Sequence, residues 1–340
     1  MRKLIKKLSD MRGISGFEYR LNKEIAKELE PYCDEVRIDP LGSVIGVKRC
    51  KKAGAPSVMI EAHCDEIGLI VTSVTDNGFI TFSNVGGIDP RILPSLEVTV
   101  HGKKDVKGII GIKPDYMNEP GKSIKMRDMA IDTGIENISD IVSVGDSITI
   151  AQSVGALGKS QWSGKTLDDR ASLAAIIRAM KELHNKELNV DVYAVAAVQE
   201  EVGLRGGKTS SYGINPTMAI AIDVTHGITP DNSNRAFELG KGATISVGPN
   251  IHPKLSKRLF EIADKYGIKA VAEVDGGCTG TDAWEIQTAA DGVPTALLSL
   301  PLKYMHTSVE TIDISDARAV SELLIHFIED AEEDISWLSL

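Results

Sequence analysis

Histidines and carboxylates follow several apolar segments of this 340-residue chain. The pair Glu200 and Glu201 comes one residue after the apolar run 192–198. A short run this rich in valine predicts a strand that is buried on both faces. Other apolar runs end in the same way: His63 follows 57–62, Asp223 follows 217–222, and His306 comes shortly after 295–300. The same kinds of side chain therefore recur at the ends of predicted strands.

The chemistry of these side chains indicates bound divalent metal ions. In an open α/β sheet, ligands bind beyond the carboxyl ends of the strands, where such residues would meet. Adjacent carboxylates are costly to bury unless a cation pairs with them. Imidazole nitrogens and carboxylate oxygens are ligands for zinc and for harder divalent ions. A further carboxylate pair, Asp168 and Asp169, stands at the start of a predicted helix and adds to the same candidate site.

A hydrolase that uses two divalent ions about 3.5–4 Å apart needs a shared carboxylate, further nitrogen and oxygen ligands, and a separate base. Asp65 lies two residues beyond His63, so in an extended segment both side chains point the same way and Asp65 can orient the imidazole. A glycosidase is a poorer fit, because its two carboxyl groups flank the scissile bond from opposite sides. The candidate ligands are His63, one of Asp168 and Asp169, one of Glu200 and Glu201, Asp223 and His306. If the chain bends beyond the strand, one glutamate can bind metal while the other acts as general base.

Composition and charge narrow the class of protein. The net charge of −10 argues against nucleic acids and anionic membranes as partners. No apolar run is long enough to span a membrane, and the amino terminus has the pattern of an amphipathic helix and not of a signal peptide. The four cysteines form no CxxC pair, so free thiols and a cytoplasmic location are expected.

The length of the chain favours two domains. Residues 69–156 show short alternating runs with little helical periodicity, and the sequence Asp-Asn-Gly at 76–78 is a strong hairpin signal between two of these runs. We therefore expect a small β-barrel-like domain at 69–156, inserted into a catalytic domain made of residues 1–68 and 157–340. The alternative is that 69–156 forms a long, decorated edge of the main sheet.

In the rest of the chain, predicted strands alternate with predicted helices. This order is typical of an α/β fold with a mostly parallel sheet and flanking helices. Ser15 and Glu18 fit a capping box at the start of one helix. Another helix is predicted to begin at Pro253 and to end before Gly267, because proline favours the first turn and glycine the residue after the last.

Short segments that contain these residues occur in a set order along the chain: 13–16, 62–68, 85–87, 164–170, 199–206, 223–225 and 305–306. In this order they resemble the metallopeptidase family of glutamyl and deblocking aminopeptidases, whose members are often mislabelled endoglucanases. The resemblance covers nearly the whole chain. Cys64 stands where the family commonly has an apolar residue, often methionine, and Ser308 stands where proline is frequent. Neither departure removes a candidate ligand.

The resemblance implies a fold of the zinc-peptidase type and a site with two divalent ions per subunit, usually zinc and sometimes cobalt. By position, Asp168 would bridge the ions, His63 and Asp223 would complete the ligands of one, and Glu201 and His306 those of the other. Glu200 would be the general base that takes a proton from an activated water, and Asp65 would orient His63. Asp169 would follow Asp168 through a strained cis peptide bond.

The resemblance also implies an activity and an assembly. The expected reaction is the removal of the amino-terminal residue from peptide substrates. The inserted domain would join subunits into dimers, and these homodimers would assemble into a tetrahedral dodecamer. The alternatives are a dinuclear amidase or deacylase on the same scaffold, and a non-catalytic protein that binds peptides in an assembly.

The residue types leave several points open. The preferred amino-terminal residue of the substrate can be acidic, apolar or basic, and segments 225–240 and 275–285 would shape its pocket. Asp282 lies either on a loop that lines this pocket or in a plain turn. His226 is either an ordinary loop residue or a substrate contact. Cys64 is expected to pack in the core, with a role as a soft metal ligand as the alternative.

Overall fold

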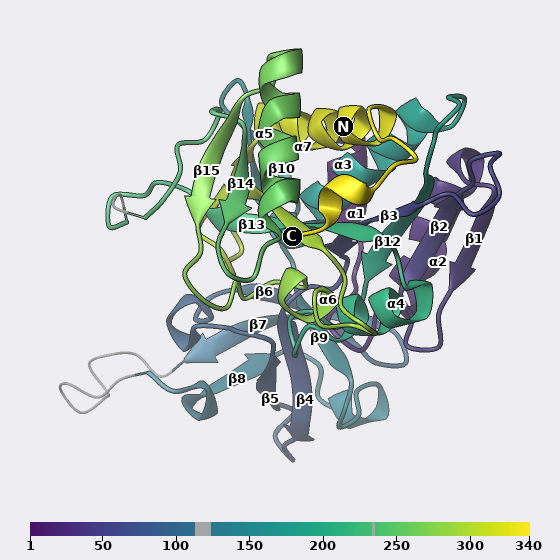
Figure 1. The fold of residues 1–340 in the computed structure, drawn as a ribbon. Helices are drawn as coiled ribbons and strands as arrows, with labels where there is room; N and C mark the ends of the chain where they lie inside the picture. The colour runs from purple at the N-terminus through teal and green to yellow at the C-terminus, as the bar shows by residue number, and fades with distance from the viewer. Residues whose placement is uncertain (113–123, 233–234) are drawn as a thin grey trace.

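A computed structural model of the chain describes residues 1–112, 124–232 and 235–340. Figure 1 shows a layered domain of helices and sheet, which contains both termini, and a β-barrel that lies below it. The barrel strands come from one continuous part of the chain, drawn in dark blue to teal, and the chain before and after them forms the layered domain. This arrangement confirms the predicted α/β fold with a small barrel.

The layered domain is built on one large sheet whose central strands β12, β3, β13 and β16 run parallel. The strand order is β1-β2-β12-β3-β13-β16-β17-β11-β10, with β14 paired to β16 and β15 paired to β14. The outer strands β2 and β17 pair antiparallel with this centre. The bounds are β1 Glu35–Ile38, β2 Val44–Lys48, β3 Ser57–His63, β10 Gly155–Leu157, β11 Gln161–Gly164, β12 Asp191–Ala197, β13 Met218–His226, β14 Ala243–Val247, β15 Ala270–Val274, β16 Thr295–Lys303 and β17 Glu310–Asp313.

Helices cover both faces of this sheet. Val58 and Ile60 of β3 belong to the core shared with α1, α2, α3, α5 and α7, whereas Met59 between them faces the core beneath α4 and α6. Successive strand residues point to opposite faces, so an apolar run without polar alternation can be buried on both. The bounds are α1 Arg2–Ser9, α2 Tyr19–Leu29, α3 Leu167–Leu183, α4 Arg205–Ile214, α5 Pro253–Tyr266, α6 Ala283–Ile286 and α7 Ile314–Glu329.

The barrel is closed in the strand order β4-β5-β8-β7-β6-β9. The predicted hairpin is present: β4 and β5 pair antiparallel, and Gly78 in the turn between them has a left-handed φ of 80°. Ile80, Val98 and Ile131 are among the side chains that fill the interior. The role of this part in dimerisation remains a prediction. The bounds are β4 Gly68–Val74, β5 Ile80–Val85, β6 Glu97–His101, β7 Asp105–Ile112, β8 Met129–Asp132 and β9 Ser147–Ile150.

Local sequence signals located some elements correctly. α5 begins at Pro253 and ends before Gly267, which has a left-handed φ of 65°. The four cysteines are free thiols, as expected. Among the helices of the described ranges, none combines the length and the apolar character needed to cross a membrane.

Candidate metal centre

The predicted metal ligands lie together at one edge of the central sheet. His63 is the last residue of β3, and Asp223 lies near the end of β13. Glu201 follows β12, His306 follows β16, and Asp168 lies in the first turn of α3. All five line one cavity of about 300 Å³. The carboxyl ends of the parallel strands therefore bring distant parts of the chain to one point, as this class of fold does with its ligand sites.

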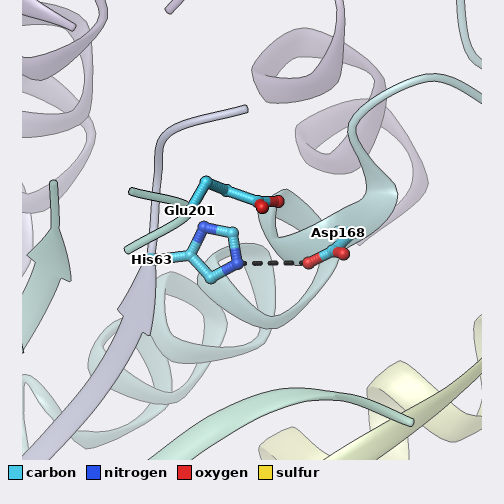
Figure 2. A group of neighbouring side chains, drawn as sticks. All are labelled: His63, Asp168 and Glu201. Carbon is cyan, nitrogen blue, oxygen red and sulfur yellow. Dashed lines mark hydrogen bonds and ion pairs between the residues drawn. The ribbon is translucent and has the colours of Figure 1, made fainter. Parts of the chain in front are cut away.

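Asp168 lies between the two histidines. One of its carboxylate oxygens is 3.1 Å from Nε2 of His63, the contact drawn as a dashed line in Figure 2. Its other oxygen is 3.4 Å from Nε2 of His306, and that nitrogen is 3.3 Å from Glu201. Each histidine thus presents the same ring nitrogen to a different oxygen of Asp168. A carboxylate that bridges two metal ions needs this placement.

Asp223 and Asp169 form a second group with His63. Ligand atoms of the three residues lie within 4.8 Å of one another. Asp169 is fully buried, and within the described ranges neither of its carboxylate oxygens has a hydrogen-bond partner. The peptide bond between Asp168 and Asp169 is cis, as the resemblance implied. The residue types left open which of Asp168 and Asp169 is a ligand, the resemblance assigned the role to Asp168 alone, and the structure makes Asp169 a candidate beside it.

The adjacent residues Glu200 and Glu201 have different surroundings. The chain bends at Gln199, whose φ of 57° is left-handed, and both carboxylates line the cavity. Glu201 contacts a histidine directly, whereas the carboxylate of Glu200 is 4.0 Å from Nε2 of His63. Burial raises the pKa of Glu200 to about 10, although His63 lowers it and Asp223 adds to the rise. A nearby divalent cation would oppose this shift, because it stabilises the ionised carboxylate.

Asp65 lies behind the candidate ligands and joins two segments. Its carboxylate is 3.5 Å from Nδ1 of His63, and its carbonyl oxygen is closer, at 3.2 Å. The carboxylate also accepts the backbone N–H groups of Glu200 and Glu201, at 3.1 and 3.2 Å. Burial acts to raise the pKa of Asp65, but hydrogen bonds from His63, Ser15 and the Glu200 amide hold it below its ordinary value. The position of Asp65 suits the predicted orienting role, which remains a prediction.

The capping box predicted at Ser15 and Glu18 is wrong. α2 begins at Tyr19 and has no side-chain cap. The Ser15 hydroxyl donates instead to Asp65 at 2.5 Å, and the Glu18 carboxylate accepts the backbone N–H of Gln199 at 3.1 Å. Glu18 also accepts the nearby backbone N–H of Gly16 at 2.9 Å, but both side chains make tertiary contacts, so two residues with the local pattern of a helix cap support the segment that carries Glu200.

The outer ring nitrogens of the two histidines face backbone carbonyl groups. Nδ1 of His306 is 2.8 Å from the carbonyl oxygen of Gly87, and Nδ1 of His63 faces that of Asp65. In the tautomer in which Nδ1 donates, Nε2 keeps its lone pair for a metal ion. Gly87 follows β5, so the barrel contributes directly to this site.

Glu310, which was not among the residues predicted from the sequence, holds two of the candidate ligands. Glu310 is buried at the start of β17, and its two carboxylate oxygens accept the backbone N–H groups of Asp168 and His306, each at 3.1 Å. One side chain therefore sets the relative position of two distant segments. The sequence signal was only an acidic residue four positions after His306, and no motif distinguishes it.

Glu61 and Asp282 form a buried pair that the sequence did not predict, although it had marked Asp282 as a possible pocket residue. Glu61 precedes His63 by two residues on β3, so both point to the same face. The carboxylate oxygens of Glu61 and Asp282 are buried and have no hydrogen-bond partner among the residues described. Burial and then the proximity of Asp282 raise the pKa of Glu61 well above its ordinary value. Asp282 is thus a buried residue, while Thr279 and Thr281 just before it line the cavity.

The side chains of the cavity fit divalent cations because no lysine or arginine among the described lining residues balances their negative charge. Lys165 and Arg170, which lie near Asp168 in the sequence, form ion pairs with Glu66 instead, at 2.5 and 3.6 Å. Buried carboxylates without a partner are costly, and metal coordination is one of the few ways to offset that cost.

Protonation of the cavity residues is the other way to reduce the negative charge of the cavity. The pKa values of these residues show how strongly protonation is favoured. Burial raises the pKa of Asp223 to about 8, with Asp168 adding to the rise. Burial acts to lower the pKa of His306, but Asp168 and Glu201 raise it to about 11. Metal ions bind the deprotonated forms of these groups, so we expect metal binding to release protons from them.

The structure shows the positions of two residues whose roles the sequence left open. Cys64 is fully buried in the larger core, and its thiol donates to the side-chain oxygen of Asn22 at 3.5 Å. The packing role predicted for Cys64 is confirmed. His226 is the exposed last residue of β13 and lines the cavity, so it is placed where a substrate can contact it.

Comparisons with known proteins agree over almost the whole chain. Residues 42–323 match a family model described as M42 glutamyl aminopeptidase. A lysyl aminopeptidase from Pyrococcus furiosus is 35% identical over 338 residues, which cover 96% of this chain and 96% of that protein.

Solved structures give the same result. The structure of an aminopeptidase from the archaeon Desulfurococcus kamchatkensis superposes with a TM-score of 0.92 at 35% identity, covering 99% of this chain and 96% of that one. The TET1 peptidase of Pyrococcus horikoshii, which can assemble into a tetrahedron or a large octahedral shell, has a TM-score of 0.86 at 32% identity, covering 97% of this chain and 99% of that one.

Proposed function

The chain belongs to the M42 glutamyl aminopeptidase family, and from this premise we propose that it removes amino-terminal residues from peptides by means of two divalent metal ions. Membership confirms the resemblance found in the sequence and makes the protein an aminopeptidase by family. The proposed ions are zinc, which cobalt can replace. The proposed roles are Asp168 as bridging ligand, His63 and Asp223 as ligands of one ion, Glu201 and His306 as ligands of the other, and Glu200 as general base.

The observation that carries this proposal is the position of Asp168 between two histidines, with Glu200 beside it. The two carboxylate oxygens of Asp168 face Nε2 of His63 and of His306 at 3.1 and 3.4 Å. Glu200 lines the same cavity, and its carboxylate lies farther from Nε2 of His63, at 4.0 Å, than that of Asp168 does, which supports a role in proton transfer. Bound in this cavity, two divalent ions would polarise the scissile carbonyl group and lower the pKa of a water molecule toward neutrality.

Side chains of this protein would carry out the proton transfers and hold the reacting groups in position. Glu200 would take the proton from the attacking water and then deliver it to the departing amine, because one carboxylate can act first as base and then as acid. Asp65 holds the backbone N–H of Glu200 and so keeps the base at the edge of the cavity. Glu310 fixes Asp168 relative to His306 through their backbone N–H groups.

An amidase or deacylase on the same scaffold would share the metal ligands and differ in its need for a free amino terminus. A pair of peptide anilides, one with a free α-amine and one acetylated, separates the two activities. We expect the free-amine substrate to be preferred by about 10²-fold or more in kcat/KM, because a site built around a polar group discriminates strongly against its absence. Preference for the acetylated substrate would support the deacylase, and no turnover of either would support a non-catalytic protein.

We also propose that the protein is a homo-oligomer in which the barrel joins subunits into dimers that assemble further, up to a dodecamer. Support comes from the assemblies described for Pyrococcus horikoshii TET1 and from apolar side chains that the barrel leaves exposed, Ile109 at 55% and Val144 at 68%. Light scattering should give a mass well above that of one 36.6 kDa chain. A single-chain mass at micromolar concentration would contradict the assembly and leave the proposed chemistry untouched.

A further inference from the structure

The cavity that holds the candidate ligands extends beyond them to the edge of the sheet. Its far wall includes Glu273 on β15 and Asp275 just after that strand. Neither side chain is near enough to the histidines to form a contact with them in the structure, and neither has a role in the proposed chemistry. An acidic wall with no lysine or arginine among the described lining residues therefore needs its own explanation.

The carboxylate of Glu273 is held in place by two hydroxyl groups. Thr225 donates to one of its oxygens and Thr244 to the other, each at 2.5 Å. Each oxygen can accept a further hydrogen bond, because a carboxylate has about four acceptor positions. Burial and the nearby Asp275 raise the pKa of Glu273, while the hydroxyl groups of Thr225, Thr244 and Ser299 lower it. Glu273 is thus a fixed, half-buried acceptor that lines the cavity.

The register of β13 sets the separation between Glu273 and the metal ligands. Asp223 and Thr225 are two residues apart on this strand, so both point to the same face, about 7 Å apart. Glu273 accepts the hydroxyl of Thr225 and so lies roughly one pleat repeat beyond Asp223. A long side chain attached to a residue whose carbonyl lies at the metal ligands can span such a distance.

We propose that this cavity binds a basic residue at the amino terminus of the substrate, with Glu273 as the partner of the side-chain ammonium or guanidinium group and Asp275 adding negative charge beside it. This inference rests on the proposed aminopeptidase function and names its substrate class. An apolar side chain would leave the Glu273 carboxylate desolvated and without a cation. An acidic side chain would meet two carboxylates of its own sign, which disfavours it.

The decisive comparison uses lysyl and norleucyl anilides, because the two side chains have the same stem and differ by the terminal ammonium group. We expect the unsubstituted protein to prefer lysyl over norleucyl substrate by at least about 10-fold in kcat/KM, and to accept an arginyl substrate and reject a glutamyl one. Glu273→Gln should lower the ratio of lysyl to norleucyl kcat/KM by about 10–100-fold, since glutamine keeps the size of the side chain and removes its charge.

Control variants separate this local effect from a change in overall charge. Glu187→Gln removes the same charge from a side chain that is 86% exposed and that pairs with Lys51. This variant should not change the ratio of lysyl to norleucyl kcat/KM. Asp275→Asn should lower the ratio by less than Glu273→Gln does. If Glu273→Gln folds poorly by thermal unfolding, inhibition of the unsubstituted protein by free lysine and by free norleucine supplies the same comparison, with lysine expected to bind about 10-fold more tightly.

Several outcomes would overturn the inference. An active enzyme with no preference for lysyl over norleucyl substrate refutes it and leaves the aminopeptidase function standing. A Glu273→Gln variant that loses both substrates equally places Glu273 at the substrate α-amine or in a structural role, and also refutes it. A protein that hydrolyses no anilide of the panel with metal bound refutes the proposed function itself, and this inference with it.

Discussion

Glu200→Gln should lower kcat by about 10²–10⁴-fold, the range that a general base contributes, while the protein still binds its metal ions. Glutamine keeps the length of the side chain but cannot take a proton from water. Glu200 is absent from the two groups of residues whose ligand atoms converge closely, so its replacement should leave the candidate metal site in place. Steady-state kinetics with a peptide anilide, together with metal content by elemental analysis, checks both parts of this expectation.

The neighbouring variant Glu201→Gln is the matched control. Glu201 lies with His63 and Asp168 in one of the convergent groups and contacts His306 at 3.3 Å. Its replacement should therefore lower metal content as well as activity, and added zinc should restore part of the activity. The two variants would then differ in metal content: Glu200→Gln would lose activity and keep its metal ions, whereas Glu201→Gln would lose both. Full turnover by a metal-loaded Glu200→Gln protein would remove Glu200 from the role of base.

Removal of divalent ions should abolish turnover and lower the melting temperature. The reason is that buried carboxylates such as Asp169 and Asp223 would lose the cations that offset their charge. A ligand present at 100 times its Kd stabilises a folded protein by about 2.7 kcal/mol, so the loss of two ions should be visible as a shift of several degrees. Dialysis against a chelator, followed by calorimetry and an activity assay, measures both effects.

The control for this experiment is dialysis against the same chelator after it has been saturated with zinc. This treatment should change neither the turnover nor the melting temperature. Zinc or cobalt added back to the demetallated protein should restore activity and melting temperature together. Unaltered catalysis after demetallation, verified by elemental analysis, would rule out the proposed metal chemistry. Restored stability without activity would leave the ions with a structural role only.

The sequence was sufficient to find these candidate ligands because each lies where a recognisable local pattern begins or ends. His63 and Asp223 end apolar runs that form the parallel strands β3 and β13, and the runs are apolar because both faces of the sheet are covered. The turn at 76–78 and the helix end at Gly267 depend on the conformational freedom of glycine, a property of the residue itself. Patterns of this kind act over a few residues, so they can be read without the fold.

The supporting contacts could be assigned only from the tertiary structure. Ser15 and Glu18 have the local pattern of a helix cap, yet their partners are Asp65 and the backbone of Gln199. Glu310 belongs to no motif and nevertheless joins two ligand segments.

The partners of Glu273 could also be assigned only from the tertiary structure. They depend on β15 lying beside β14 and near the end of β13. Residue type and spacing determined which side chains can bind metal. The meeting of distant segments decided which carboxylates and backbone carbonyl groups hold the residues that carry those side chains, because a buried polar group takes as its partner whatever the fold places within hydrogen-bonding distance.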